Sequence, residues 1–206
     1  MKNLLSKRTL NKYSRQIILK DVGIIGQKKI FNSKILVVGA GGLGSPVIDL
    51  LVRAGVGFLG VIEDDKVDYS NLHRQTLYDY NDVGKYKSDV IKKKIKLIND
   101  KIKLKIFKER AKDKNLSKIL PKFDIIVDGT DNFPTKFLLN KYSLKYRKKL
   151  VIGAISKFDG HIFSFDFSQK KIPCLNCFYQ GMPSDEIFNC EDEGILGPTA
   201  NIIGAL

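Results

Sequence analysis

The chain has 206 residues and a mass of 23.3 kDa, which is the size of one ordinary domain with a substantial core and excludes a disulfide-held miniprotein or a repeat scaffold. Hydrophobic residues make up 43% of it, far more than a disordered polyelectrolyte carries. Its 36 basic and 22 acidic residues give a net charge of +14, but 30 of the basic residues are lysines scattered along the chain, so charge alone does not indicate a nucleic-acid surface.

Targeting signals and cysteine usage set the expected compartment. No apolar stretch approaches the roughly 18 residues of a membrane-spanning helix, and the lysine-rich N-terminus has no apolar signal core. We therefore expect a cytoplasmic protein with no membrane partner. Cys174, Cys177 and Cys190 lie within 17 residues of one another, which in such a chain favours metal or thiol chemistry over disulfides.

The first elements in chain order form a βαβ pattern. Residues 3–31 carry apolar positions spaced as in short helices that lie against a core. Residues 34–39 are a β-branched run that ends in glycines, residues 43–54 have helical periodicity, and residues 58–63 are a second apolar run. This order predicts a strand, a helix and a strand.

The alternation continues along the chain. Further helices are expected at 85–98 and 132–146, and further strands at 103–107, 124–128 and 150–154. Residues 161–167 alternate in polarity and predict an antiparallel edge strand. Residues 197–206 read as the start of an apolar helix that stops abruptly, which suggests that the native chain continues.

These elements predict an α/β fold with a Rossmann-like, doubly wound and mostly parallel sheet that has helices on both faces. We expect a single domain over 1–206. It comprises an N-terminal helical segment (1–32), a nucleotide-binding core (33–155) and a C-terminal region (156–206) whose antiparallel edge carries the cysteine loop.

A glycine-rich loop follows the first strand. The glycines Gly39, Gly41, Gly42 and Gly44 fit the spacing G-x-G-x-x-G at a strand-to-helix turn, where backbone N–H groups and a helix N-terminus can hold phosphate. Glu63 follows Gly44 by 19 residues, at the end of the second strand, and is placed to accept hydrogen bonds from ribose hydroxyls. The loop predicts a nucleotide but does not distinguish NAD, FAD and ATP.

The residues after Glu63 favour a triphosphate. The polar residues of this stretch are Asp64, Asp65, Asn71, Arg74, Gln75 and Lys87. A triphosphate needs cations and a metal, which Arg74, Lys87 and a Mg²⁺ held by Asp131 would supply. Each residue alone has a simpler explanation, because Arg74 and Lys87 could be surface cations and Asp131 could cap the next helix.

Several short motifs occur in one order along the chain. They are Tyr13-Ser-Arg15-Gln16-Ile17, the glycine loop, Ser70-Asn71-Leu72-His73-Arg74-Gln75, Val83-Gly84-Lys85-Tyr86-Lys87, Asp128-Gly-Thr-Asp131-Asn132 and Cys174-Leu-Asn-Cys177. Together, from about Tyr13 to Leu206, they resemble the ThiF/MoeB/HesA family, the bacterial relatives of ubiquitin-activating enzymes.

The resemblance implies an ATP-dependent adenylyltransferase. Such an enzyme joins AMP to the C-terminal glycine carboxylate of a small ubiquitin-like sulfur carrier ending in Gly-Gly and releases pyrophosphate, before thiocarboxylate formation in molybdopterin or thiamin biosynthesis. A sulfurtransferase is the implied sulfur donor. No specific nucleic-acid partner is implied.

The resemblance also implies residue roles. The loop glycines would contact phosphate, Glu63 the ribose, Asp131 the Mg²⁺, and Arg15 the ATP site of the neighbouring subunit in a homodimer. The remaining residues implied to bind the nucleotide are Asp65, Ser70, Asn71, Arg74, Lys87 and Asn132.

The cysteines and two other positions depart from the family pattern. Cys174 and Cys177 have the spacing of half a Zn²⁺ site, and the second pair of ligands that the family supplies is lacking here, with Cys190 and His161 as conceivable substitutes. Cys190 matches a thiol that some members use in transfer, although its acidic neighbours should raise its pKa. Glu63 replaces a more usual Asp and His73 a more usual Gln.

Two other functions remain open at this point. An NAD-dependent Rossmann oxidoreductase would share the glycine loop and Glu63 but would leave Arg74, Lys87 and Asp131 unexplained. A non-catalytic basic binding module or pseudoenzyme is suggested by the charge of +14.

Overall fold

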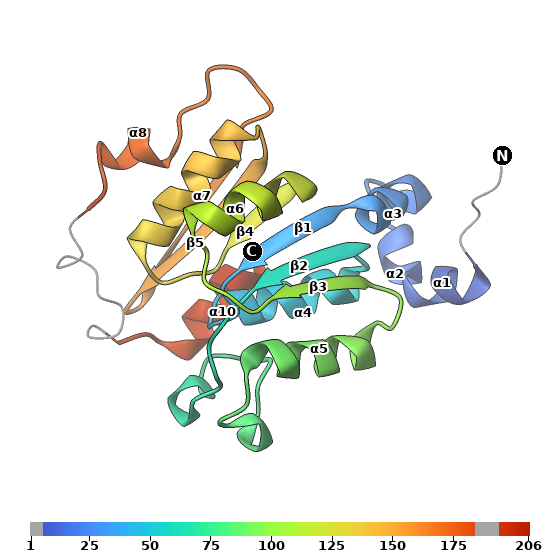
Figure 1. Ribbon diagram of the computed structural model, residues 1–206. Helices are drawn as coiled ribbons and strands as arrows, with labels where there is room; N and C mark the ends of the chain where they lie inside the picture. The colour runs from blue at the N-terminus through green and yellow to red at the C-terminus, as the bar shows by residue number, and fades with distance from the viewer. Residues whose placement is uncertain (1–5, 184–193) are drawn as a thin grey trace.

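A computed structural model describes residues 6–183 and 194–206, which form one six-stranded sheet with helices around it (Figure 1). The strand order is β3-β2-β1-β4-β5-β6. The strands are β1 (Lys34–Val38), β2 (Phe58–Ile62), β3 (Lys103–Phe107), β4 (Ile125–Asp128), β5 (Lys149–Ser156) and β6 (Asp159–Asp166). All neighbours pair in parallel except β6, which is antiparallel to β5 at the edge.

Helices cover both faces of this sheet, because successive side chains of a strand point to opposite faces. On β1, Ile35 and Val37 belong to one core cluster, whereas Leu36 and Val38 belong to the other. The first cluster is closed by α4 (Gly44–Ala54) and α5 (Lys87–Ile98), and the second by α6 (Asp113–Ile119) and α7 (Phe133–Lys145). Figure 1 shows the two pairs of helices on opposite sides of the strands.

The remaining helices lie at the ends of the sheet. The N-terminal helices α1 (Lys7–Lys12), α2 (Ser14–Ile17) and α3 (Gly23–Asn32) gather at the amino ends of β1 and β2 (Figure 1). Towards the C-terminus, α8 (Leu175–Tyr179) contacts α7, and α10 (Gly197–Ala205) packs against α4, β5 and β6. Three 3₁₀ turns complete the set, at η1 (Tyr69–Asn71), η2 (Tyr80–Asp82) and η3 (Leu120–Lys122).

The strand register decides where functional side chains can meet. Val38 of β1 pairs with Ile62 of β2 and with Asp128 of β4, while Ile62 also pairs with Phe107 of β3. The segments that follow these strands therefore leave the sheet at one edge, as expected for ligand sites of parallel α/β sheets.

The fold class is confirmed, including the antiparallel edge strand. The short helices α6 and α8 were not expected, because stretches of 7 and 5 residues show too little periodicity to be recognised. Burial of Leu116 and Ile119 stabilises α6 instead. The helix expected from residue 85 begins at Lys87, because Tyr86 forms a β-bridge with Lys66. The proposed internal boundaries of the domain stay predictions. Among the described helices, none combines the length and hydropathy needed to cross a membrane.

Candidate nucleotide-binding site

The glycine loop connects β1 to α4 and depends on glycine at two positions. Gly39 has a φ of +81°, a conformation that side chains disfavour. A Cβ on Gly44 would collide with the carbonyl oxygen of Gly39. The loop therefore turns too tightly for larger residues and leads directly into the N-terminus of α4.

The peptide of Ala40 anchors this loop from both sides. Its N–H donates to Oε2 of Glu63 at 2.8 Å, and its carbonyl accepts from the hydroxyls of Tyr78 at 2.9 Å and Ser45 at 3.1 Å. Burial raises the pKa of Tyr78, so its hydroxyl remains a protonated donor. The loop is thus held in place without using the N–H groups that follow Ala40.

Those following N–H groups form a candidate anion site. Within the residues that the structure describes, the N–H groups of Gly41, Gly42 and Leu43 have no hydrogen-bond acceptor. They precede α4, whose N-terminal end carries a partial positive charge. A phosphate would satisfy both features.

Glu63 lies beside the loop but is already engaged. It is 6% exposed, and its two carboxylate oxygens accept the N–H groups of Ala40 and Asp65, each at 2.8 Å. It therefore positions the loop. Because each oxygen can accept a second hydrogen bond, its predicted contact with ribose stays a prediction.

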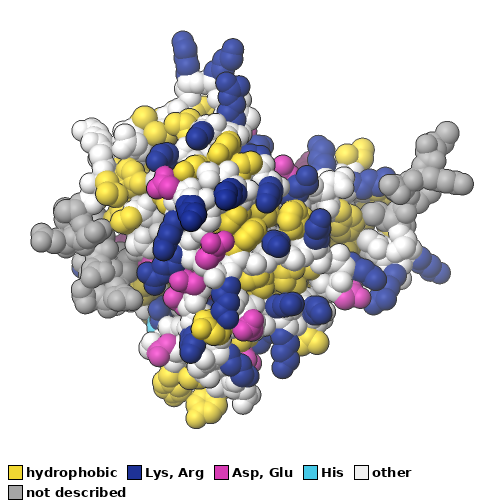
Figure 2. All heavy atoms as spheres, viewed as in Figure 1, with side chains coloured by type: hydrophobic (Ala, Val, Ile, Leu, Met, Phe, Trp, Pro, Cys, Tyr) yellow, Lys and Arg dark blue, Asp and Glu magenta, His cyan; other side chains and the backbone are white. Residues whose placement is uncertain are grey.

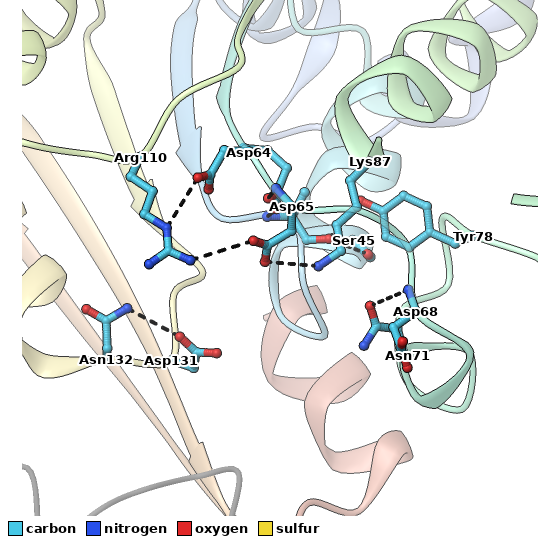
Figure 3. Close-up of polar contacts among 12 residues, drawn as sticks. Ser45, Asp64, Asp65, Asp68, Asn71, Tyr78, Lys87, Arg110, Asp131 and Asn132 are labelled. Atoms are coloured by element: carbon cyan, nitrogen blue, oxygen red, sulfur yellow. Dashed lines mark hydrogen bonds and ion pairs between the residues drawn. The ribbon is translucent and has the colours of Figure 1, made fainter. Parts of the chain in front are cut away.

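An ion network joins the segment after β2 to the start of α5 and to the segment after β3 (Figure 3). Lys87 is only 5% exposed, and its Nζ lies 3.5 Å from Oδ2 of Asp65. Arg110 approaches from the other side, with Nη2 at 3.9 Å from Oδ1 of Asp65 and Nε at 3.2 Å from Oδ2 of Asp64. The interpretation of Lys87 as one surface lysine among many is therefore wrong. Two cations converge on one carboxylate.

Sequence analysis missed Arg110. It follows β3, and the pairing of β3 with β2 brings its side chain to the acidic residues after β2. The only signal in the sequence was that it is one of 6 arginines and follows an expected strand. Its partners could not be deduced, because they are 46 residues away along the chain.

The turn η1 carries Ser70 and Asn71 and leads to Arg74. Asp68 begins it: its Oδ1 accepts the Ser70 hydroxyl at 2.7 Å and the Ser70 N–H at 2.8 Å, which lowers the pKa of Asp68. The N–H of Asp68 in turn donates to Oδ1 of Asn71 at 3.2 Å. Arg74 folds back on this turn, with Nη1 at 2.9 Å from the Ser70 carbonyl oxygen and 3.0 Å from Nε2 of His73.

A buried ion pair supports the turn after β4. Asp128 is 1% exposed and Lys136 is 5% exposed, with Nζ at 3.2 Å from Oδ2. Lys136 also donates to the carbonyl oxygens of Thr130 at 2.6 Å and Gly153 at 2.7 Å, so its three protons all have acceptors. Asp128 accepts the N–H and hydroxyl of Thr130 as well. Sequence analysis missed Lys136, which fixes the turn that presents Asp131.

Asp131 is not the cap of the next helix, and that interpretation is wrong. Asn132 caps α7, because its Oδ1 accepts the N–H of Thr135 at 3.0 Å. Asp131 is exposed, and its one hydrogen bond within the described residues comes from the Asn132 amide, at 3.3 Å. Figure 3 draws both residues on the same side of the network as Arg110, with no contact between them and Arg110. Asn132 thus has a structural task, whereas the Asp131 carboxylate has no cation partner among the described residues.

The carboxylates at this edge suit magnesium. Mg²⁺ prefers oxygen ligands, and Asp131 offers an unpaired carboxylate. Glu63, Asp64 and Asp65 also bring carboxylate oxygens within 4.8 Å of one another, but the last two are paired with Arg110 and Lys87. Asp131 is accordingly the better candidate of these residues.

Arg15 is not part of this site within one chain. It is exposed on α2, at the amino ends of the strands, whereas the glycine loop lies at their carboxyl ends (Figure 1). Its expected role at a neighbouring subunit stays a prediction.

The cysteines form a separate cluster on α8. Sγ of Cys174 and Sγ of Cys177 are 3.6 Å apart. Burial raises the pKa of Cys174, but hydrogen bonds from the Cys177 backbone and the Asn140 side chain outweigh it, so the pKa lies below the ordinary thiol value, which suits a metal-binding thiolate. Among the described residues, neither His161 nor any other His, Cys, Asp or Glu joins the pair as a third ligand. Cys190 lies outside the described residues.

The geometry can now be compared with known proteins. The model of the ThiF family matches residues 13–206. The chain belongs to the ThiF family. The family match agrees with the resemblance that the ordered motifs indicated.

Curated relatives in the family are named adenylyltransferases. The chain is 39% identical to "Sulfur carrier protein adenylyltransferase" of Thermus thermophilus, covering 98% of this chain and 76% of that protein. It is 38% identical to "Probable molybdopterin-synthase adenylyltransferase" of Gracilaria tenuistipitata var. liui, covering 97% and 56%. It is also 38% identical to "Adenylyltransferase and sulfurtransferase MOCS3" of Culex quinquefasciatus, covering 100% and 47%. The chain thus spans about half the length of the last two relatives.

Solved structures agree with the fold. The crystal structure titled E. coli MccB + ATP matches with a TM-score of 0.80 and 26% identity, covering 95% of this chain and 60% of that one. The SeMet PaaA structure matches with a TM-score of 0.81 at 20% identity, covering 99% and 64%, which shows the fold alone. The relatives' names favour adenylyl transfer over the NAD-dependent oxidoreductase.

Proposed function

We propose that this chain carries the adenylating site of an enzyme that uses ATP to activate the C-terminal glycine carboxylate of a small ubiquitin-like sulfur carrier. The observation that carries the proposal is the buried Lys87 at the same sheet edge as the free N–H groups of the glycine loop. Lysines are rarely buried unless they are paired, and Lys87 is paired with Asp65, whose N–H shares the Glu63 carboxylate with the glycine loop. The names of the relatives supply the reaction type.

The reaction joins two anions, so charge and position are its main requirements. A carboxylate oxygen of the carrier attacks the α-phosphorus, the bond from that phosphorus to the bridging oxygen of the β-phosphate breaks, and pyrophosphate leaves with the electron pair. The product is an acyl-adenylate, and no protein nucleophile is needed. Loop N–H groups, Arg74 and Lys87 would hold the phosphates and balance their charge. Mg²⁺ at Asp131 would neutralise part of the phosphate charge when bound.

The finer parts of the proposal follow from the family resemblance. Glu63, Asp65, Ser70, Asn71 and Asn132 would surround the nucleotide. A homodimer would bring Arg15 of each subunit to the nucleotide-binding site of the other subunit. Zn²⁺ would bind the cysteine pair of α8 with two further ligands, and a later sulfur transfer would convert the activated carrier to a thiocarboxylate in molybdopterin or thiamin biosynthesis.

The positive charge supports a role in capturing the carrier. On the face drawn in Figure 2, Lys and Arg side chains are spread over the surface and outnumber Asp and Glu. A spread of this kind lacks the stripe that a nucleic-acid groove shows, but it would raise the encounter rate with an acidic carrier. Association with the carrier should therefore slow as ionic strength rises.

ATP–pyrophosphate exchange tests the proposal. The purified chain is assayed with a carrier ending in Gly-Gly, alongside Lys87→Ala and Asp131→Ala. The matched control is Lys94→Ala, which removes a lysine of the same helix that pairs with Asp79 and Asp82 instead. Carrier-dependent exchange should fall by about 10²-fold or more in the first two variants and persist in the control.

Three results would count against the proposal. Exchange that survives Lys87→Ala unchanged would remove its central observation. Tight binding of NADH without binding of Mg·ATP would instead favour the oxidoreductase. A steep salt dependence of duplex binding would support a nucleic-acid module.

A further inference from the structure

Gln75 is a buried side chain beside the glycine loop whose hydrogen bonding is incomplete. It is 3% exposed, and its Oε1 is a buried atom without a partner among the described residues. Its backbone is fixed, because its N–H donates to the carbonyl of Asn71 at 2.9 Å and its carbonyl accepts from Tyr78 at 3.1 Å. The side chain is therefore held in place, yet unsatisfied.

The amide of Gln75 faces the part of the loop that has free N–H groups. Its Nε2 lies 3.7 Å from the position that a Cβ on Gly41 would occupy. Within the described chain, Nε2 makes no hydrogen bond, and neither does the N–H of Gly41 or of Gly42. A side-chain donor without a partner thus lies beside the segment of the loop whose backbone donors also have none.

Such incomplete bonding needs a physical reason. Native proteins pair nearly all buried polar atoms, since an unpaired one costs free energy. Of the four buried side-chain atoms without a partner in the described residues, those of Gln75, Ser88 and Asn201 belong to residues at the candidate site or next to it. Ser88 follows Lys87, and the amide of Asn201 donates to the carbonyl of Arg74 at 3.2 Å. Of these atoms, the one on Gln75 belongs to the side chain that lies against the glycine loop.

We propose that Gln75 contacts the nucleotide, with its amide Nε2 donating to a phosphate oxygen held by the glycine loop; this inference rests on the function proposed above. An amide suits the position, because it donates to an anion without adding charge between the cations Arg74 and Lys87. The phosphate would then supply the acceptor that Nε2 lacks among the described residues.

A second buried glutamine shows what a structural role looks like. Gln27 is 0% exposed, its Nε2 donates to the carbonyl of Ala54 at 3.0 Å, and its Oε1 accepts from Gln16 at 2.9 Å. It lies at the opposite end of the sheet. Gln27 is therefore the matched control for Gln75.

The test combines thermal unfolding with direct titration of Mg·ATP on the full chain. Gln75→Leu should leave the Tm of the free protein unchanged or higher, because it removes an unpaired polar group. Its Kd for ATP should rise about tenfold, and the rise in Tm caused by ATP should shrink, since a hydrogen bond to a charged group is lost. Gln27→Leu should lower the Tm of the free protein and keep the wild-type Kd.

A second variant covers the case in which Gln75→Leu does not fold. Gln75→Glu has nearly the same shape and should weaken ATP binding by more than tenfold at neutral pH, because its carboxylate repels phosphate. A wild-type Kd in either folded variant overturns the role of Gln75.

The same titration separates the two proposals. In one outcome, wild type binds ATP, Lys87→Ala does not, and the Gln75 variants bind as wild type does. The adenylating site then stands and the inference about Gln75 fails. If wild type binds no ATP, or Lys87→Ala binds as well as wild type, the proposed function itself fails and takes this inference with it.

Discussion

Two buried polar side chains at the amino ends of the strands have hydrogen-bond partners, whereas several polar groups at the carboxyl ends have none among the described residues. The side chain of Gln27 donates to the carbonyl of Ala54 and accepts from Gln16. The Asn99 amide donates to the Tyr13 hydroxyl at 3.3 Å and to the carbonyl of Val52 at 3.2 Å. At the other end, the side-chain amide of Gln75 and the N–H groups of Gly41, Gly42 and Leu43 remain free within the described residues. The contrast teaches how to separate polar groups that stabilise the fold from groups reserved for a ligand.

The largest expected effect comes from the ion pair under the carboxyl edge. Lys136→Met leaves Asp128 buried without its cation, and we expect a loss of about 3–5 kcal/mol in the free energy of unfolding. Denaturant unfolding measures it. Lys141→Met removes an exposed lysine of the same helix and should change little. A small effect of Lys136→Met would mean that this edge is not rigidly supported.

A pair of glycine variants sharpens the comparison between the two ends. Gly44→Ala places a Cβ against the Gly39 carbonyl and should cost about 3 kcal/mol and abolish ATP binding. Gly23→Ala, at the amino end, has a φ of +54° but open space around it, so we expect about 1 kcal/mol of backbone strain and normal ATP binding. Unfolding and ATP titration of both variants check this. Equal losses of binding would show that the loop is not the nucleotide site.

Two buried tyrosines allow a finer test. Tyr13→Phe and Tyr78→Phe each remove one hydroxyl hydrogen bond, to Asn99 and to the Ala40 carbonyl respectively, and each should cost about 1 kcal/mol of stability. Only Tyr78→Phe should raise the Kd for ATP, since only that hydroxyl holds the loop. Isothermal titration would reveal the difference. An equal change in Kd for Tyr13→Phe would contradict the proposal that only the Tyr78 hydroxyl supports the nucleotide-binding loop.

The smallest effect concerns acidic pH at the turn η1. The Ser70 hydroxyl and N–H lower the pKa of Asp68 from its ordinary value of 3.8. The stability that this carboxylate contributes is therefore present above that value and is lost as pH falls through the lower pKa of the folded state. The difference in Tm between wild type and Asp68→Ala should accordingly be largest near neutral pH and vanish once the pH lies below the lowered pKa of the folded state. A difference that grows on acidification would contradict the contact.

Much of the fold and part of the site followed from local patterns. The strands, the helices α4, α5 and α7 and the antiparallel edge were predicted, because periodicity over such lengths reports burial. Lys87 and Asp131 were chosen from the motifs they belong to. Arg110 and Lys136 were missed, since no neighbour in the sequence distinguishes them from other basic residues. The hydrogen bond by which Glu63 holds the glycine loop was also not predicted from the sequence.

Local sequence patterns account for the strand-helix alternation, the tight glycine turn and the residue types at the ends of the strands. These depend on backbone preferences and on spacing along the chain. Which of those residues are buried, and which contact one another, depends on how the strands and helices pack. The parallel register brings the ends of β1, β2, β3 and β4 to one edge. There Asp65 pairs with Arg110, Asn132 rather than Asp131 caps α7, and the side-chain Oε1 of Gln75 is buried with no partner among the described residues. Pairing and burial arise between segments far apart in sequence, so they cannot be deduced from either segment alone.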